Sequence, residues 1–126
     1  MPARVLPIAF LAVLVATGCA QVREARMNEA GNGYLTCLNA AADKNMDNPA
    51  GAEEIAIAAH AHCWTQWKEY REAIETSFIR RARSAEEAQL AHDKADAHLR
   101  QFEFEARKAI MGRVVQRTYG VPGAKR

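Results

Sequence analysis

The sequence predicts an all-α protein, an antiparallel three-helix bundle that runs up, down and up and is closed by one disulfide. The chain is rich in alanine and holds only four prolines and seven glycines. This composition favours helices, because alanine loses no side-chain entropy on entering one. Two long segments repeat apolar residues at steps of three and four, as helices with one buried face do. Two cysteines flank a segment of helix-breaking residues that separates the first two predicted helices.

Length, composition and charge narrow the class of protein. At 126 residues the chain has room for one domain. Apolar residues make up 49% and charged residues 25%, which is typical of a folded rather than a disordered chain. The net charge is only +2 and no run of like charges is long enough to act as a basic arm, so we expect no nucleic-acid partner.

The first element is residues 1–18, MPARVLPIAFLAVLVATG. One cation, Arg4, is followed by an apolar run over 5–17 that closes on small residues. As a helix this run would span roughly 20 Å, which is shorter than the ~30 Å hydrocarbon core of a bilayer. A short apolar segment behind a positive start is typical of a secretory signal peptide.

Cys19 follows this segment directly, after Gly18. Residues 1–21 resemble the signal peptide and lipobox of bacterial lipoproteins, although Ala16 stands where that family usually has leucine. The resemblance implies that the signal peptide is removed and that Cys19 becomes an acylated amino terminus, with palmitate among its acyl groups. Ala20, rather than aspartate, resembles the pattern of lipoproteins sent to the outer membrane, where this one would face the periplasm. The alternative is an uncleaved signal anchor with Cys19 as an incidental thiol.

Residues 19–32 are expected to serve as the lipid anchor and tether, and the helical domain is expected to span 33–118. Gly31 and Gly33 cost a helix roughly 2 kcal/mol relative to alanine. We therefore expect a kink or a frayed helix start there.

Cys37 and Cys63 are predicted to form the disulfide. They stand equally far from residue 50, within a loop that contains Pro49 and Gly51. In antiparallel helices such positions lie at the same height, as a disulfide requires. An exported chain also meets an oxidising compartment. Closing a loop of this size stabilises a fold by roughly 3 kcal/mol.

The remaining helices are predicted over 52–81 and from Ser84 to near Arg117, with 119–126 as a flexible tail. Ser84 and Glu87 have the spacing of a capping box. The apolar face of the earlier helix comprises Ile55, Ala59, Cys63, Trp67, Tyr70, Ile74 and Phe78, and that of the later one comprises Ala88, His92, Ala95, Leu99, Phe102, Ala106 and Ile110.

The turn between these two helices is strongly basic. If the first helix continues through residues 22–30, Val22 lies near Phe78 and the turn lies beside the lipidated end. Cations there would be attracted to anionic lipid; the alternative is an ordinary solvated helix end. The candidate membrane-surface residues are Arg80, Arg81 and Arg83.

A second apolar stripe, Leu90, Ala97, Phe104 and Met111, repeats at seven on the last helix. We expect it to be the edge of the core, and the alternative is a seam for a partner. The same two alternatives apply to Trp64, which is either part of the core edge or an exposed anchor for a partner. The candidate partner-binding residues are Trp64, Phe104 and Met111.

No catalytic, metal or cofactor site is predicted. His60 and His62 are two residues apart and point to different faces of a helix, while His92 and Asp96 alone are too few for zinc. No phosphate loop or nucleophile motif is present. We therefore expect a non-enzymatic, lipid-anchored scaffold or interaction module whose partners are the membrane and another envelope protein. The alternative is a periplasmic module that binds a small ligand or inhibits an enzyme.

Overall fold

The computed structural model describes residues 8–120, with side chains described from residue 18 onward. Residues 1–7 of the predicted signal peptide and residues 121–126 of the predicted tail lie outside the described residues. The helices are α1 (Ile8–Asn45), α2 (Ala52–His62), α3 (Trp64–Ile79) and α4 (Ala85–Tyr119). The predicted all-α fold and its disulfide are confirmed. The predicted number of three helices is not, since residues 8–120 form four.

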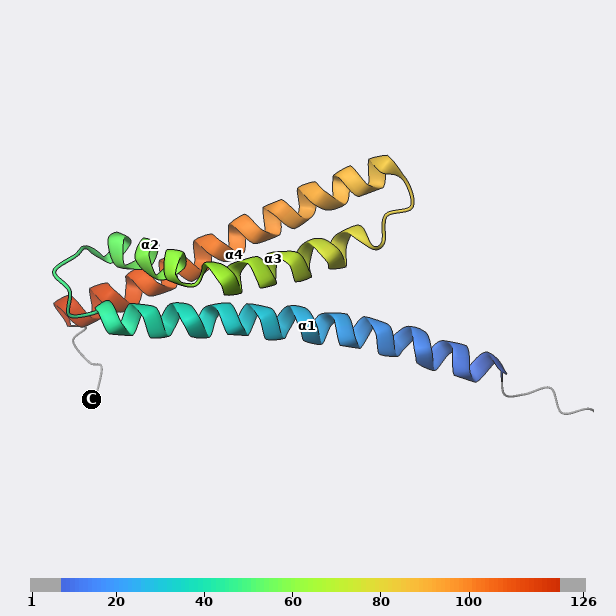
Figure 1. Cartoon of the computed structure of the whole chain (residues 1–126), viewed down its shortest axis with the longest axis horizontal. Coiled ribbons are helices and arrows are strands. Elements are labelled where there is room, and N and C mark those ends of the chain that lie inside the picture. Colours follow the sequence, from blue (N-terminus) through green and yellow to red (C-terminus); the bar gives the residue numbers. More distant parts are fainter. Residues whose placement is uncertain (1–7, 121–126) are drawn as a thin grey trace, which may run out of the picture.

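α2 and α3 follow one another along a single arm that runs antiparallel to α1 (Figure 1). α4 then returns parallel to α1 and packs on α2 and α3. It meets α1 chiefly at the end where α4 finishes beside the α1–α2 loop (Figure 1). At the other end α4 diverges from α1, and the N-terminal part of α1 extends beyond the α3–α4 turn. The two ends of the bundle are therefore built differently.

The single helix predicted over 52–81 is divided at Cys63, which ends α2 and precedes α3. The ψ of Cys63 is 22°, and its N–H donates to the carbonyls of both Ala59 and His60. The interruption has a physical reason in the spacing of the apolar residues. A step of four residues turns about 40° beyond one helical revolution, so three such steps carry a face away from the core of an unbroken helix. Ile55, Ala59, Cys63 and Trp67 are spaced in this way, yet all four are buried.

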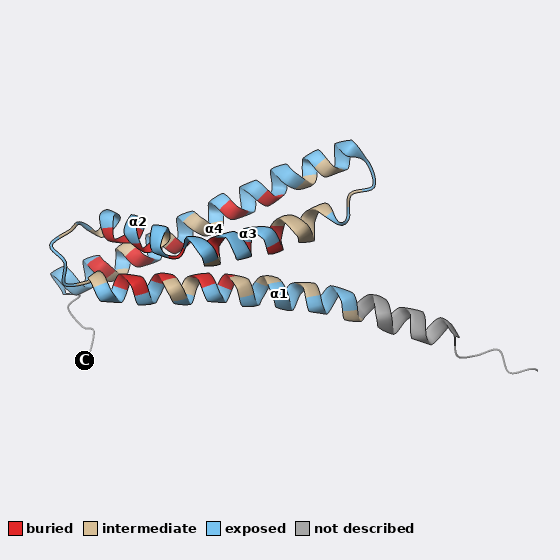
Figure 2. Cartoon of the chain, viewed as in Figure 1, coloured by how far each residue is buried: buried red, intermediate tan, exposed pale blue. Residues whose placement is uncertain are grey.

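The core is concentrated in the half of the molecule that holds the disulfide (Figure 2). Among the described side chains of α1, no residue before Gly31 is buried. Aromatic rings fill the centre of this core: the ring centroids of Tyr34 and Trp67 are 5.1 Å apart, and those of Tyr70 and Phe102 are 4.4 Å apart. The other buried apolar residues include Leu38, Ala42, Ile55, Ala59, Ile74, Ala95, Leu99, Ala106, Ile110 and Val114.

The expected kink or frayed start at residues 31–33 is wrong, because α1 continues through them. Residues 19–32, expected to be a tether, are helical as well. Gly31 is buried, and a Cβ atom at its position would lie only 3.1 Å from Cε2 of Tyr70. Glycine therefore permits the close approach of a tyrosine ring, and the packing gained there offsets its low helix propensity.

The predicted cap of α4 is confirmed in part. The Ser84 hydroxyl accepts a hydrogen bond from the Glu87 N–H at 3.1 Å. The Glu87 carboxylate reaches back one residue further than expected and accepts from the Arg83 N–H at 2.6 Å. α4 ends at Tyr119, two residues later than predicted, where Gly120 adopts a φ of 61° that favours glycine.

Candidate functional site

The disulfide joins Cys37 of α1 to Cys63, at the junction of α2 and α3, as predicted. The two Cα atoms are 5.8 Å apart, within the usual range for a disulfide. Cys63 is completely buried. The bond therefore lies inside the core and acts as a structural crosslink between the first two arms of the fold.

Cys19, the predicted lipidation site, is a free and exposed cysteine on α1. It lies twelve residues before Gly31, the first buried residue among the described side chains of α1. Val22, one turn further along, is 69% exposed, so this part of the helix has no close cover. The thiol is thus accessible to chemistry from outside the bundle.

Two tyrosine–histidine pairs cross the aromatic core, and sequence reasoning missed both. The Tyr34 hydroxyl lies 2.6 Å from Nδ1 of His60, and the Tyr70 hydroxyl lies 2.9 Å from Nε2 of His98. Each pair joins two different helices, α1 to α2 and α3 to α4. The spacing of aromatic and histidine residues within one helix carries no signal for such pairs, because the contact depends on the register between helices.

The environment of these hydroxyls keeps them neutral. Burial, followed by the negative charge of Glu103, raises the pKa of Tyr34 above its ordinary value, against the opposing effect of Arg107. Burial alone raises the pKa of Tyr70. Glu103 also lies 4.0 Å from Nε2 of His60 and pairs with Arg107 at 2.8 Å. The arrangement is a polar network that fixes the register of the helices around an aromatic core.

The other two histidines take no part in this network. His62 and His92 are both exposed. Among the residues that the structure describes, no group of three or more histidine, cysteine, aspartate or glutamate side chains is arranged to hold a metal ion.

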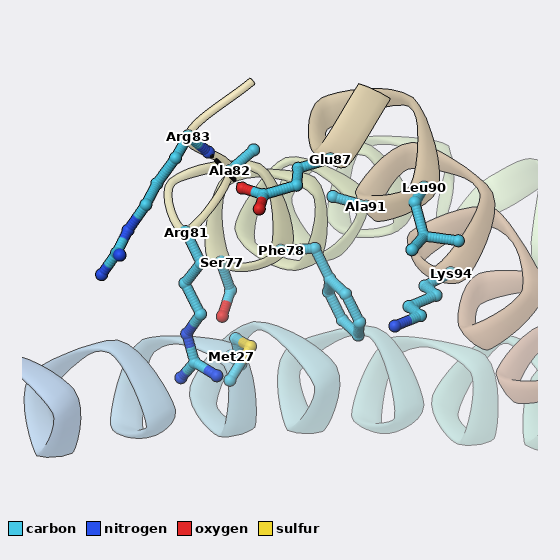
Figure 3. A pocket seen from close by; sticks show the side chains of 10 residues that line it. All are labelled: Met27, Ser77, Phe78, Arg81, Ala82, Arg83, Glu87, Leu90, Ala91 and Lys94. Carbon is cyan, nitrogen blue, oxygen red and sulfur yellow. Dashed lines mark hydrogen bonds between the residues drawn. The ribbon is translucent and has the colours of Figure 1, made fainter. Parts of the chain in front are cut away.

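A groove of about 680 Å³ lies where α1 passes the α3–α4 turn (Figure 3). Its apolar lining comes from three helices and the α3–α4 turn and consists of Met27, Phe78, Ala82, Leu90 and Ala91. Its charged lining consists of Arg81, Arg83, Glu87 and Lys94. Volumes of this size are typical of sites for small molecules. The groove is a concavity of ligand size, and sequence reasoning did not find it.

The three arginines of the turn do not act as one cluster. In Figure 3, Arg81 extends down to α1 and ends beside Met27, whereas Arg83 points away from the groove. Arg80 caps the end of α3 and is exposed. The turn meets α1 at Met27 rather than at Val22, about one and a half helical turns further along than expected. Cys19 therefore lies about 12 Å beyond the groove along α1, at 1.5 Å per residue.

Of the candidate partner-binding residues, Trp64 and Phe104 are exposed, at 48% and 59%, whereas Met111 is half-buried against the core. The ring of His60 lies 6.0 Å from that of Trp64, and Nε2 of His60 lies 4.0 Å from Glu103, which precedes Phe104. Trp64 and Phe104 thus flank the same contact between α2–α3 and α4. The expectation that Leu90, Ala97 and Phe104 form the edge of the core is wrong, because all three are exposed; it holds only for Met111.

Comparisons with known proteins add no assignment: no family model, no curated protein and no solved structure matches this chain. In the part of the chain that the structure describes, no helix has an apolar stretch long enough to cross a membrane.

Proposed function

We propose that the chain is a small lipid-anchored protein of the cell envelope that acts as a non-enzymatic scaffold or protein-interaction module. The observation that carries the proposal is the free, exposed Cys19, which follows the apolar segment 5–17 after Gly18 alone. An acylated cysteine at this position holds a protein to a bilayer strongly, because each buried lipid methylene contributes about 0.8 kcal/mol.

The buried disulfide supports an extracytoplasmic location. Disulfides persist in oxidising compartments such as the bacterial periplasm and are rare where thiols are kept reduced. The bond between Cys37 and Cys63 therefore agrees with export. Together with Ala20 after the acylated cysteine, this supports the periplasmic face of the outer membrane as the proposed location.

Metabolic labelling with a palmitate analogue tests the anchor. The full chain should incorporate label and fractionate with membranes, and Cys19→Ser should lose both properties. The double variant Cys37→Ala/Cys63→Ala is the matched control, because it removes two other cysteines and should keep the label. Persistent label in Cys19→Ser, or an unlabelled wild-type chain, would contradict the proposal.

The interaction surface is proposed at Trp64 and Phe104, which expose large apolar side chains beside the contact between α2–α3 and α4. Exposed aromatic side chains are typical anchors of protein interfaces. A photo-crosslinking residue at position 104 should give a discrete adduct with another envelope protein in intact cells. The same residue at Ala109, which is exposed on the same helix but lies about 140° around its axis from Phe104, should not. Equal adducts at both positions would indicate that no specific partner binds here.

A second candidate function, ligand binding, is favoured by a separate observation. The groove beside Met27 and Phe78 combines an apolar lining with basic side chains. A scaffold that works only through its outer surface has no need for such a concavity. The two candidate functions use different residues, since neither Trp64 nor Phe104 lines the groove, so each can be tested without the other.

A further inference from the structure

The groove between α1 and the α3–α4 turn has an uneven distribution of charge. Its lining includes three cations, Arg81, Arg83 and Lys94, but only one carboxylate, Glu87. That carboxylate already accepts a hydrogen bond from the Arg83 N–H at 2.6 Å. The groove therefore has an excess of positive charge at its surface.

Two of these cations border the apolar part of the groove. Figure 3 shows Arg81 and Lys94 extending toward α1 on the two sides of Phe78, with Met27 beside the Arg81 guanidinium. Within residues 18–120, neither Arg81 nor Lys94 takes part in an ion pair or a side-chain hydrogen bond of the protein. By contrast, Arg113 and Arg117 of α4 pair with Asp43 and Asp47. The charges at the groove are thus available to an external anion.

The apolar lining requires a ligand with an apolar body. Met27 and Phe78 are half-buried, Leu90 is 53% exposed, and all three lie on different helices. Covering their exposed area would remove apolar surface from water, which is favourable in proportion to the area covered. A small hydrophilic anion such as inorganic phosphate would leave this area exposed.

We propose that this groove binds a single-chain anionic amphiphile, a fatty acid, with its acyl chain along Met27, Phe78 and Leu90 and its carboxylate on Arg81. Arg81 is the better partner of the two cations, because a planar guanidinium can donate two parallel hydrogen bonds to one carboxylate. Lys94, beyond Phe78, adds a second positive charge with a smaller effect. The inference names the ligand class for the second candidate function and does not depend on acylation of Cys19.

Calorimetric titration of the purified full chain carrying Cys19→Ser tests the proposal, with dodecanoate as the probe at concentrations below micelle formation. Dodecanoate should bind, and decanoate should bind about tenfold more weakly, because two fewer methylenes are buried. The neutral dodecanol should also bind at least about tenfold more weakly, because it lacks the charge that Arg81 recognises. Equal binding of dodecanoate and dodecanol, or binding to anionic vesicles but not to dodecanoate, would overturn the proposal.

Two pairs of variants locate the site. Arg81→Ser should weaken dodecanoate binding about tenfold. Arg80→Ser, which removes a neighbouring exposed cation that does not line the groove, should change it less than about twofold. Ala91→Phe should fill the groove and abolish binding, whereas Ala109→Phe, at an exposed position of α4 about 27 Å along the helix from Ala91, should preserve it.

Circular dichroism of each variant checks that the helices are retained. Because Arg81 lies on the surface, its variant keeps the test informative even if Ala91→Phe does not fold. Dodecanoate binding that survives both Arg81→Ser and a folded Ala91→Phe would place the ligand elsewhere and overturn the proposal. Loss of palmitate labelling at Cys19 would leave it intact, so the two proposals fail separately.

Discussion

The two ends of this bundle differ in how they are held together. At the end around the disulfide, α1 contributes buried residues from Gly31 to Ala42, and tyrosine–histidine pairs and ion pairs join neighbouring helices. At the end around the α3–α4 turn, the side chains are half-buried or exposed and enclose a groove. The buried core of this fold and its open, ligand-sized space therefore lie in different parts of the same helices.

Two leucines of α4 test this comparison most strongly. Leu99 is 4% exposed in the core, whereas Leu90 is 53% exposed at the groove. Leu99→Ala should lower the free energy of unfolding by about 4 kcal/mol, because it removes buried methyl groups and leaves a cavity. Leu90→Ala should change it by less than about 0.5 kcal/mol. Urea unfolding measures both, and equal losses would show that the groove end is as well packed as the core.

The disulfide should have the next largest effect. Cys37→Ala/Cys63→Ala should lower the free energy of unfolding by about 3 kcal/mol, since the unfolded chain regains the freedom that the crosslink removes. Cys19→Ser is the control and should leave stability unchanged, because its side chain is exposed. A double variant as stable as the wild type would mean that the core alone holds α1 in place.

High pH should weaken the disulfide end through its tyrosines. The pKa values of Tyr34 and Tyr70 are raised above 10.0 in the folded chain, mainly by burial. Above that pH the unfolded chain loses these protons while the folded chain retains them, so the free energy of unfolding should fall as pH rises past about 10. Below it, both states keep the protons and this contribution to stability is fully present. Urea unfolding across this range should show a smaller decline in Tyr34→Phe, and an unchanged decline would exclude Tyr34 as its source.

The smallest effect should come from two glycines of α1. Gly33→Ala meets open space and should stabilise the helix by about 0.5–1 kcal/mol. Gly31→Ala gains the same propensity but forces its Cβ against the ring of Tyr70, which Phe102 and His98 hold in place. Overpacking of this kind costs about 1–3 kcal/mol, so Gly31→Ala should be the less stable variant. Thermal unfolding compares them, and equal stability would show that Tyr70 can move.

The sequence was most informative where local spacing determines the structure. Cys37 and Cys63 pair because they stand equally far from the loop, and Ser84 caps α4 because helix N-termini leave unpaired N–H groups. The break at Cys63 also has a signal in the sequence, because the apolar positions 55, 59, 63 and 67 are each four residues apart. This spacing resembles that of one continuous helix, so the break was not predicted. Spacing of this kind does not report how far helices slide past one another.

The features that sequence reasoning missed depend on contacts between helices. Gly31 suggested a weak helix until Tyr70 was seen to pack against it. The α3–α4 turn was expected near Val22 and lies near Met27, which is why the groove and the position of Arg81 were not anticipated. The outer stripe of α4 was expected to be partly covered, but no helix in the described chain covers Leu90 or Phe104.

The uninterrupted course of α1 has a mechanical consequence for any chain held at Cys19. A flexible linker would let the folded domain take many orientations relative to an attached surface. A continuous helix between Cys19 and Met27 acts instead as a stiff spacer of fixed reach, about 12 Å. Such a helix would fix the distance between the anchored residue and the first side chain of the groove.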